Sequence, residues 1–247
     1  MIEPEPKIGI KIFSGFKRFF HWSMVIFVIL LFLSGLYIGD PGFNGLVGTE
    51  PTYAVKSFFT MSAMRKMHLI CGLLLIVVLL MNIYSSIRYP GDRLMPKFAS
   101  KKYWKDAGWA VKHYLFFPVK EHEYLRSPLA RLSYFLIYIC FFIMAITGLA
   151  MMVQIDPTSI WGKIFGPVNN LFSEYTVHYI HHVVAWVFII FAIIHMYLAV
   201  RTDYLEHNGE LSAMFSGYKF YAYVPFDAED VPGVTEQFLE KKRDVLK

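Results

Sequence analysis

Residues Tyr175 to Val200 read YTVHYIHHVVAWVFIIFAIIHMYLAV, a stretch of 26 residues without Asp, Glu, Lys or Arg. An α-helix rises 1.5 Å per residue, so about 20 residues cross the roughly 30 Å hydrocarbon core of a bilayer. This stretch is therefore long and apolar enough to form a transmembrane helix. A spanning β-strand is excluded, because transmembrane strands are shorter and alternate apolar with polar residues.

Three further charge-free stretches, of 21, 21 and 24 residues, precede it: Phe19 to Gly39, Met67 to Ile87 and Leu132 to Ile155. Of the 247 residues, 56% are hydrophobic and 17% charged, whereas a typical soluble domain is about one quarter charged. We therefore predict an all-α membrane protein, a bundle of four transmembrane helices that forms one domain. The predicted segments are helices at about 19–39, 67–87, 130–153 and 177–200, a basic cytoplasmic loop at 88–131 and a cytoplasmic tail at 201–247.

The positive charges predict the orientation of these helices. The 24 Lys and Arg residues divide 20 to 4 between the two sets of alternate loops. Positive residues gather on the cytoplasmic side of a membrane, so both termini and the central loop are predicted to be cytoplasmic, an N-in/C-in topology. Arg65 and Lys66 are an exception, since they lie on the sparse side directly before the second stretch.

The central loop contains a segment with a different pattern. Trp104, Trp109, Leu115 and Phe116 are interspersed with lysines, which predicts a cytoplasmic amphipathic helix held on the inner surface by membrane lipid. The net charge of +5 does not indicate a nucleic-acid partner, because the cations form no stripe interleaved with aromatic residues. With only two cysteines, a metal cage of thiolates is excluded.

Four of the nine histidines lie inside or at the ends of the predicted spans: His21, His68, His181 and His195. An ionisable side chain in a membrane is costly, so a functional role is the default hypothesis. A lone histidine is as often a hydrogen-bonded packing residue, so mutual geometry must decide. His181 and His195 are 14 residues apart, which places them about 40° apart on one helix face and about 21 Å apart along the axis.

The predicted topology pairs these histidines by depth. His21 and His195 lie at the inner ends of their helices, and His68 and His181 lie at the outer ends. Two imidazole pairs stacked across an apolar bundle are typical of two b-type haems, each with bis-His ligation. The chain has no C-x-x-C-H segment, so the haems are predicted to be bound non-covalently.

Other residues fit the same hypothesis. Arg18, Arg65 and Lys66 lie beside the predicted ligands, where they would pair with haem propionates; the alternative is that they contact lipid head groups. Glycines within the spans leave space for a flat macrocycle near the backbone. These are Gly35, Gly72 and Gly148.

Two other classes of protein remain open from the residues alone. A transporter uses membrane histidines for protons or metal ions. A membrane anchor uses them only for packing. Neither class binds haem, so a visible spectrum separates both of them from the cytochrome hypothesis.

The chain resembles the b-type cytochrome subunit of membrane-bound nickel–iron uptake hydrogenases, a relative of the cytochrome b subunit of formate dehydrogenase. The likeness covers nearly the whole chain. It is carried by F-H-W at Phe20 to Trp22, R-K-M-H at Arg65 to His68, S-P-L-A at Ser127 to Ala130, T-G-L-A at Thr147 to Ala150, H-Y-I-H at His178 to His181, H-M-Y-L-A-V-R-T-D at His195 to Asp203, and S-G-Y-K at Ser216 to Lys219. At His182 the family pattern has Arg.

This resemblance implies an electron-transport subunit of a respiratory hydrogen:quinone oxidoreductase in the bacterial cytoplasmic (inner) membrane, and not the hydrogen-activating subunit. The hydrogenase small and large subunits would lie on the periplasmic face, and a formate dehydrogenase-like partner is the alternative. The outer haem would be bound by His68 and His181 and the inner one by His21 and His195. A quinone would bind near the inner haem, with His195, Tyr197, Arg201 and Asp203 as candidates; interfacial anchoring is the other interpretation of Tyr197 and Arg201.

Overall fold

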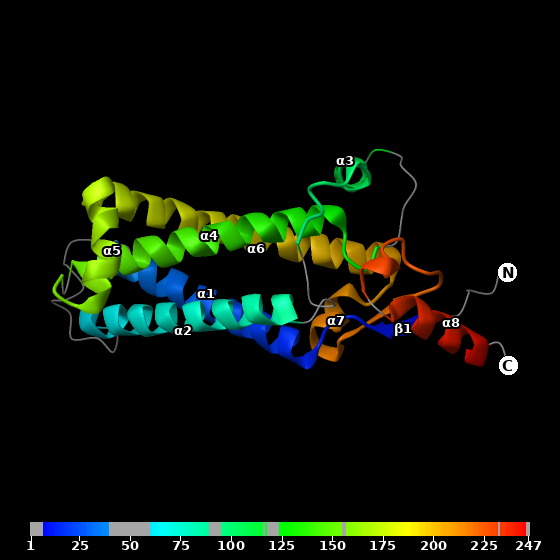
Figure 1. The fold of residues 1–247 in the computed structure, drawn as a ribbon. Helices are drawn as coiled ribbons and strands as arrows, with labels where there is room; N and C mark the ends of the chain where they lie inside the picture. The colour runs from blue at the N-terminus through cyan, green and yellow to red at the C-terminus, as the bar shows by residue number, and fades with distance from the viewer. Residues whose placement is uncertain are drawn as a thin grey trace, which may run out of the picture. The chain divides into compact units, whose positions relative to one another are not determined.

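The computed structural model describes residues 7–39, 60–88, 95–115, 117, 124–154, 157–231 and 233–245. Within this part of the chain, helices dominate and two short strands form one sheet (Figure 1). The elements are β1 (Ile8–Lys11), α1 (Gly15–Gly39), α2 (Met61–Arg88), α3 (Lys101–Tyr114), α4 (Pro128–Val153), α5 (Ile160–Leu171), α6 (Glu174–Glu206), α7 (Glu210–Ser216), β2 (Tyr218–Tyr221), η4 (Ala228–Asp230) and α8 (Val234–Val245).

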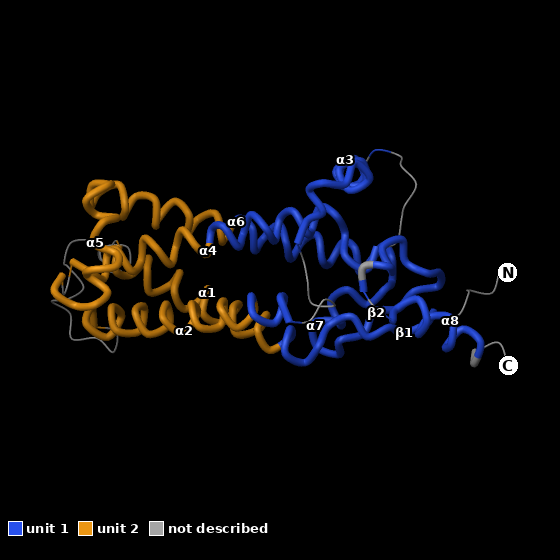
Figure 2. Tube along the Cα trace, in the orientation of Figure 1, with its two compact units in different colours: residues 1–18, 83–140, 190–247 blue, residues 19–82, 141–189 orange. Residues whose placement is uncertain are grey.

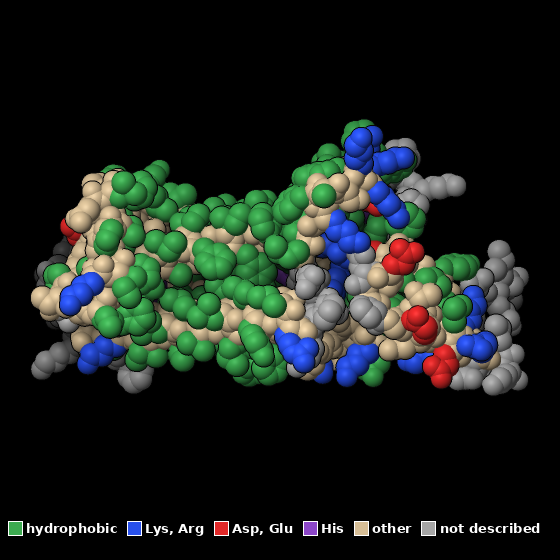
Figure 3. All heavy atoms as spheres, viewed as in Figure 1, with side chains coloured by type: hydrophobic (Ala, Val, Ile, Leu, Met, Phe, Trp, Pro, Cys, Tyr) green, Lys and Arg blue, Asp and Glu red, His purple; other side chains and the backbone are tan. Residues whose placement is uncertain are grey.

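Among the described residues, four helices are long and apolar enough to cross a membrane, namely α1, α2, α4 and α6. They contain 25, 28, 26 and 33 residues, and each includes one of the four predicted segments. The prediction of a helical membrane protein with four spans is therefore confirmed. Figure 3 shows hydrophobic side chains over much of the visible surface of these helices, as contact with lipid tails requires.

The helices extend beyond the charge-free segments because their ends are set by hydrogen bonding. Ser14 Oγ accepts a hydrogen bond of 3.1 Å from the Lys17 N–H, and Thr60 Oγ1 accepts one of 3.2 Å from the Ala63 N–H. Such hydroxyls satisfy N–H groups that have no partner in the first helical turn. Hydropathy marks the part of a helix that suits hydrocarbon, whereas these caps mark where the helix begins.

The chain divides into two compact units (Figure 2). Unit 2 comprises residues 19–82 and 141–189, which hold α5 and parts of the four long helices. Its buried side chains include Phe141 of α4 and Phe188 of α6, whose ring centres are 4.5 Å apart. Helix α5, which the sequence analysis did not predict, is joined to α4 by a 2.9 Å hydrogen bond from Asn169 Nδ2 to the Ala150 carbonyl.

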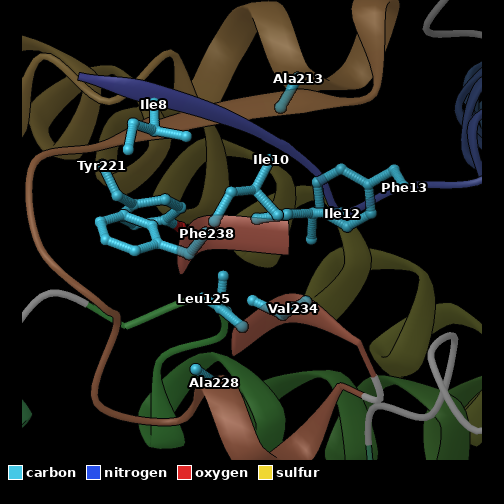
Figure 4. Packing of buried hydrophobic residues seen from close by; sticks show 10 residues of the cluster. All are labelled: Ile8, Ile10, Ile12, Phe13, Leu125, Ala213, Tyr221, Ala228, Val234 and Phe238. Carbon is cyan, nitrogen blue, oxygen red and sulfur yellow. The ribbon is translucent and has the colours of Figure 1, made fainter. Parts of the chain in front are cut away.

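Unit 1 comprises residues 1–18, 83–140 and 190–247, so it contains segments from both ends of the sequence. Strand β1 pairs with β2 in antiparallel register, Ile8 opposite Tyr221 and Lys11 opposite Tyr218. Ten buried residues form a terminal core around this sheet (Figure 4). They are Ile8, Ile10, Ile12, Phe13, Leu125, Ala213, Tyr221, Ala228, Val234 and Phe238. The predicted tail at 201–247 thus contains folded elements.

The predicted amphipathic segment forms helix α3 in unit 1. Ser100 caps it, with its Oγ accepting a 3.3 Å hydrogen bond from the Tyr103 N–H. The buried Tyr103 hydroxyl donates a 2.8 Å hydrogen bond to the Pro128 carbonyl at the start of α4. Trp104 and Trp109 remain exposed, as expected for side chains that contact lipid. Other parts of the predicted loop, residues 89–94, 116 and 118–123, lie outside the described residues.

Candidate functional site

The structure brings together two of the predicted haem ligands within unit 2. His68 of α2 and His181 of α6 have ring centres 6.3 Å apart, with their planes inclined at 61°. Both side chains are half-buried. They are the two histidines that the sequence analysis placed at the outer ends of their spans.

Each of these imidazoles is held by a hydroxyl from another helix. Ser34 Oγ of α1 lies 2.8 Å from His68 Nδ1, and Thr147 Oγ1 of α4 lies 2.8 Å from His181 Nδ1. The hydroxyls are themselves bonded within their helices. Ser34 donates to the Leu30 carbonyl at 2.7 Å, and Thr147 donates to the Ile143 carbonyl at 2.7 Å. Both Ser34 and Thr147 are buried.

A glycine follows each hydroxyl residue and lies against the same imidazole. A Cβ atom added at Gly35 would lie 3.3 Å from His68 Cε1, and one added at Gly148 would lie 3.4 Å from His181 Cε1. The third predicted glycine, Gly72, has a different environment, since its nearest contact would be Leu31 Cδ2 at 3.9 Å. Two of the three glycines therefore allow an imidazole ring to approach a helix backbone.

The neighbouring histidines of α6 bond within their own helix. His178 Nδ1 lies 3.0 Å from the Glu174 carbonyl, and the exposed His182 has its Nδ1 3.0 Å from the His178 carbonyl. The structure separates His181 from these two residues by its contacts. Only His181 of the three is bonded to a side chain of α4 among the described contacts.

The two predicted inner ligands fall in different units, and each is described within its own. In unit 1, the half-buried His195 stacks on Phe191, with ring centres 5.5 Å apart, and meets Tyr134 at 5.9 Å. In unit 2, the His21 ring lies 5.3 Å from that of Trp22. Ligation by these two histidines stays a prediction.

The three cations that were predicted to pair with haem propionates have different surroundings. Arg65 and Lys66 are exposed on the first turns of α2, before His68. Arg18 is partly buried, and its Nη1 donates a hydrogen bond to the Phe215 carbonyl at the end of α7. Arg65 and Lys66 are thus open to a charged partner, whereas Arg18 is engaged within unit 1.

The predicted quinone residues lie near the end of α6. Tyr197 is exposed, whereas Arg201 is half-buried and packs on α3. Arg201 Nη1 lies 3.3 Å from His113 Nε2, and the guanidinium carbon lies 5.4 Å from the centre of the Tyr114 ring. Burial raises the pKa of Tyr114, and a hydrogen bond with Thr202 opposes that rise. His113 therefore has a partner in this group.

The site can be tested for its fit to a bis-His haem. Metal–imidazole bonds are about 2.0–2.1 Å and a ring nitrogen lies about 1.1 Å from its ring centre, so two axial imidazoles have centres about 6.3 Å apart. The separation of His68 and His181 is 6.3 Å. Because their Nδ1 atoms are engaged by hydroxyls, each ring has its Nε2 left for a metal. The residues present fit the group.

Comparison with known proteins shows the family of the chain. Residues 12–217 match the family described as prokaryotic cytochrome b561. The chain belongs to this family. It is therefore a membrane cytochrome b, a class of protein that binds haem b and transports electrons. The family match covers all four candidate spans and all four predicted haem ligands.

Curated relatives align with most of the chain. A probable Ni/Fe-hydrogenase B-type cytochrome subunit of Azotobacter vinelandii is 26% identical over 224 residues, which cover 86% of this chain and 89% of the relative. A protein of the same name from Rhizobium leguminosarum bv. viciae is 27% identical, covering 86% and 90%. The probable Ni/Fe-hydrogenase 1 B-type cytochrome subunit of Escherichia coli K12 is 26% identical, covering 86% and 91%.

Proposed function

We propose that this chain is the di-haem cytochrome b subunit that anchors a periplasmic nickel–iron hydrogenase and carries its electrons across the membrane to the quinone pool. Haem b supplies reversible one-electron transfer at its iron when bound. The chain's own contribution is to hold two such groups at different membrane depths, in an apolar helical environment that excludes water.

The observation that carries this proposal is the pair formed by His68 and His181. Their ring centres are 6.3 Å apart, the separation that two imidazoles would have if they held one haem iron. If His68 and His181 both held the haem, the protein would leave no position on the iron for a substrate, which would suit electron transfer and not catalysis at the metal. This is the proposed outer haem site.

His21 and His195 are proposed to hold the inner haem. The support is the 14-residue spacing of His181 and His195 along α6, which places both imidazoles on one face of a single helix. Phe191 and Tyr134 pack around the His195 ring and give it an apolar, aromatic environment. The whole chain would then form one di-haem domain.

The proposed orientation in the membrane rests on the distribution of charge, and the proposed partner rests on the names of the relatives. The 20 to 4 division of positive residues supports cytoplasmic termini and a periplasmic His68–His181 site. The relatives are named as hydrogenase cytochrome subunits, which supports hydrogenase as the partner. Arg65 and Lys66 are exposed beside His68 and would pair with propionates or with an acidic surface of the partner.

The quinone is proposed to bind at the opposite end of α6. Arg201, His113 and Tyr114 bring a cation, an imidazole and a phenol together there, and these groups can bond quinone oxygens. Tyr197 lies one turn earlier on the same helix. Replacing Arg201 with Gln should slow reduction of an added quinone while leaving the reduced-minus-oxidised haem spectrum unchanged.

Haem spectra of histidine variants test the ligand assignment. The purified full chain should bind about two haems, and His68→Ala or His181→Ala should each remove the same one. His21→Ala and His195→Ala should remove the other. His178→Ala is the matched control, because His178 lies on the same helix and bonds only its own backbone among the described contacts. A colourless protein, or loss in different pairs, would overturn the assignment.

The partner is tested separately in native membranes. Hydrogen gas should reduce the b-type haem of the tagged chain, and the nickel–iron subunits should purify with it. Reduction by formate and recovery of a molybdenum enzyme would instead make the chain a formate dehydrogenase subunit.

A further inference from the structure

The two halves of the His68–His181 site have the same construction. In each half, a hydroxyl residue bonds a histidine that follows it by 34 positions, Ser34 with His68 and Thr147 with His181. In each half, a glycine next to the hydroxyl residue lies against the same imidazole. All of these residues belong to unit 2. The repetition indicates a built arrangement and not a chance contact.

The hydrogen bonds determine where the protons lie. Each hydroxyl has one proton. The hydroxyl oxygen lies 2.7 Å from a backbone carbonyl oxygen, which can only accept a hydrogen bond. If the hydroxyl gave its proton to the imidazole, two acceptor oxygens would face each other at 2.7 Å without a proton between them. Ser34 and Thr147 must therefore donate to Leu30 and Ile143 and accept from the imidazoles. Each imidazole thus carries its proton on Nδ1.

We propose that Ser34 and Thr147 are positioning residues that set the tautomer and orientation of the two outer haem ligands. With the proton on Nδ1, each Nε2 has its lone pair free to bind iron before any haem arrives. This inference rests on the proposed haem function of His68 and His181. It adds that two successive hydrogen bonds prepare each ligand before haem binds. The imidazole donates to the hydroxyl, and the hydroxyl donates to a backbone carbonyl of its own helix.

The same arrangement affects the electronic properties of the ligands. An imidazole that donates from Nδ1 is a stronger base at Nε2 and favours the oxidised metal. Loss of either hydroxyl should therefore raise the midpoint potential of the outer haem and weaken its binding. Second-layer partners of metal-binding histidines typically change metal affinity about 10–100-fold when they are removed.

The tautomer can be measured without haem. The full chain, purified in detergent without bound haem and with 15N-labelled histidine, is examined by NMR at a pH where imidazoles are neutral. The signals of His68 and His181, assigned through His68→Ala and His181→Ala, should show protonated Nδ1 and unprotonated Nε2. Protonation of Nε2 in either residue would overturn the proposal.

Variants of the haem-loaded chain give a second test. Ser34→Ala and Thr147→Ala should lower the affinity of the outer haem about 10–100-fold and raise its potential. Ser34→Thr and Thr147→Ser should keep the affinity and the potential of the outer haem near their wild-type values, because a hydroxyl remains. Ser133→Ala is the matched control, since Ser133 is also on α4 and its hydroxyl bonds the Ala130 carbonyl. It should change neither property.

The outcomes separate this inference from the proposed function. If His68→Ala removes a haem but Ser34→Ala and Thr147→Ala change neither its affinity nor its potential, the positioning role is wrong and the cytochrome function stands. If the wild-type chain binds no haem between these residues, the proposed function itself fails.

Discussion

Arg131 and Asp227 form an ion pair in unit 1, with Arg131 Nη2 3.1 Å from Asp227 Oδ2, although 96 residues separate them in the sequence. The same carboxylate accepts hydrogen bonds from the backbone N–H groups of Leu125 at 2.6 Å and Arg126 at 3.0 Å. The side chains of Arg131 and Asp227 are only 7% and 11% exposed. Asp227 thus fixes the segment that leads into the α4 membrane span.

Replacing Asp227 with Ala should destabilise the protein strongly. The change leaves the Arg131 guanidinium and two backbone N–H groups without their carboxylate, and breaking a buried pair in this way costs about 3–5 kcal/mol. Thermal unfolding of the purified protein in detergent measures the effect. Glu229→Ala is the control, because Glu229 is exposed two residues further along. Equal melting temperatures for the two variants would contradict the structural role of Asp227.

Replacing Gly35 with Ala should impair the proposed outer haem site. The new Cβ would lie 3.3 Å from His68 Cε1, closer than the normal contact distance, so the imidazole must shift. Gly148→Ala should have a smaller effect because its contact with His181 would be 3.4 Å. Gly72→Ala is the control, with its nearest atom at 3.9 Å. Haem content per chain measures the series, and an undiminished content in Gly35→Ala would show that the ring has room to move.

Replacing Ile10 with Ala should loosen the terminal core. The Ile10 side chain is fully buried, and truncating a buried Ile typically costs about 2–5 kcal/mol. Limited proteolysis should then cut the C-terminal elements faster than in the wild type. The His68–His181 pair belongs to the other unit, so the haem proposed to bind there should be retained. Leu239→Ala, at a position 50% exposed, should change the proteolysis rate little.

Tyr124 gives a prediction for alkaline pH. Burial, with the nearby Asp106 and Asp227 carboxylates, raises the pKa of Tyr124 to about 12, whereas an ordinary tyrosine has a pKa near 10. The folded protein therefore keeps this proton after the unfolded chain has lost it. The resulting stabilisation is complete below pH about 10 and is lost as the pH rises towards 12. Tyr124→Phe should flatten this decline in unfolding experiments, and an unchanged slope would contradict it.

The sequence predicted the four spans and the amphipathic helix because both depend on local composition. A charge-free stretch such as 175–200 has one stable form in lipid, whatever surrounds it. The pairing of His68 with His181 was also accessible, since it needed only helix direction and depth. These features follow from hydropathy, charge and the helical repeat alone.

The terminal core could not be predicted in the same way. Strand β1 is four residues long, and its partner β2 lies about 200 positions later. The alternation of Ile8, Ile10 and Ile12 is a strand pattern in hindsight, but three residues do not identify a partner. Helix α5 was missed because it follows a loop and is too short to span a membrane.

Ser34 and Thr147 were missed for a different reason. A hydroxyl in a membrane helix normally bonds its own backbone, so neither residue is distinctive in the sequence. Their roles depend on the rotation of α1 and α4 toward α2 and α6. The one available sequence pattern was the repeated spacing, a hydroxyl residue and glycine with a histidine 34 positions after the hydroxyl residue. That repeat becomes meaningful only once the contacts are known.

The most direct measurement of the central claim is an experimental density map of the purified full chain at a resolution that distinguishes side chains. Such a map should contain a planar macrocycle between His68 and His181, with iron bound by both imidazoles and Ser34 and Thr147 in contact with their Nδ1 atoms. A map with no macrocycle between these rings, or with the iron bound by other residues, would contradict the account.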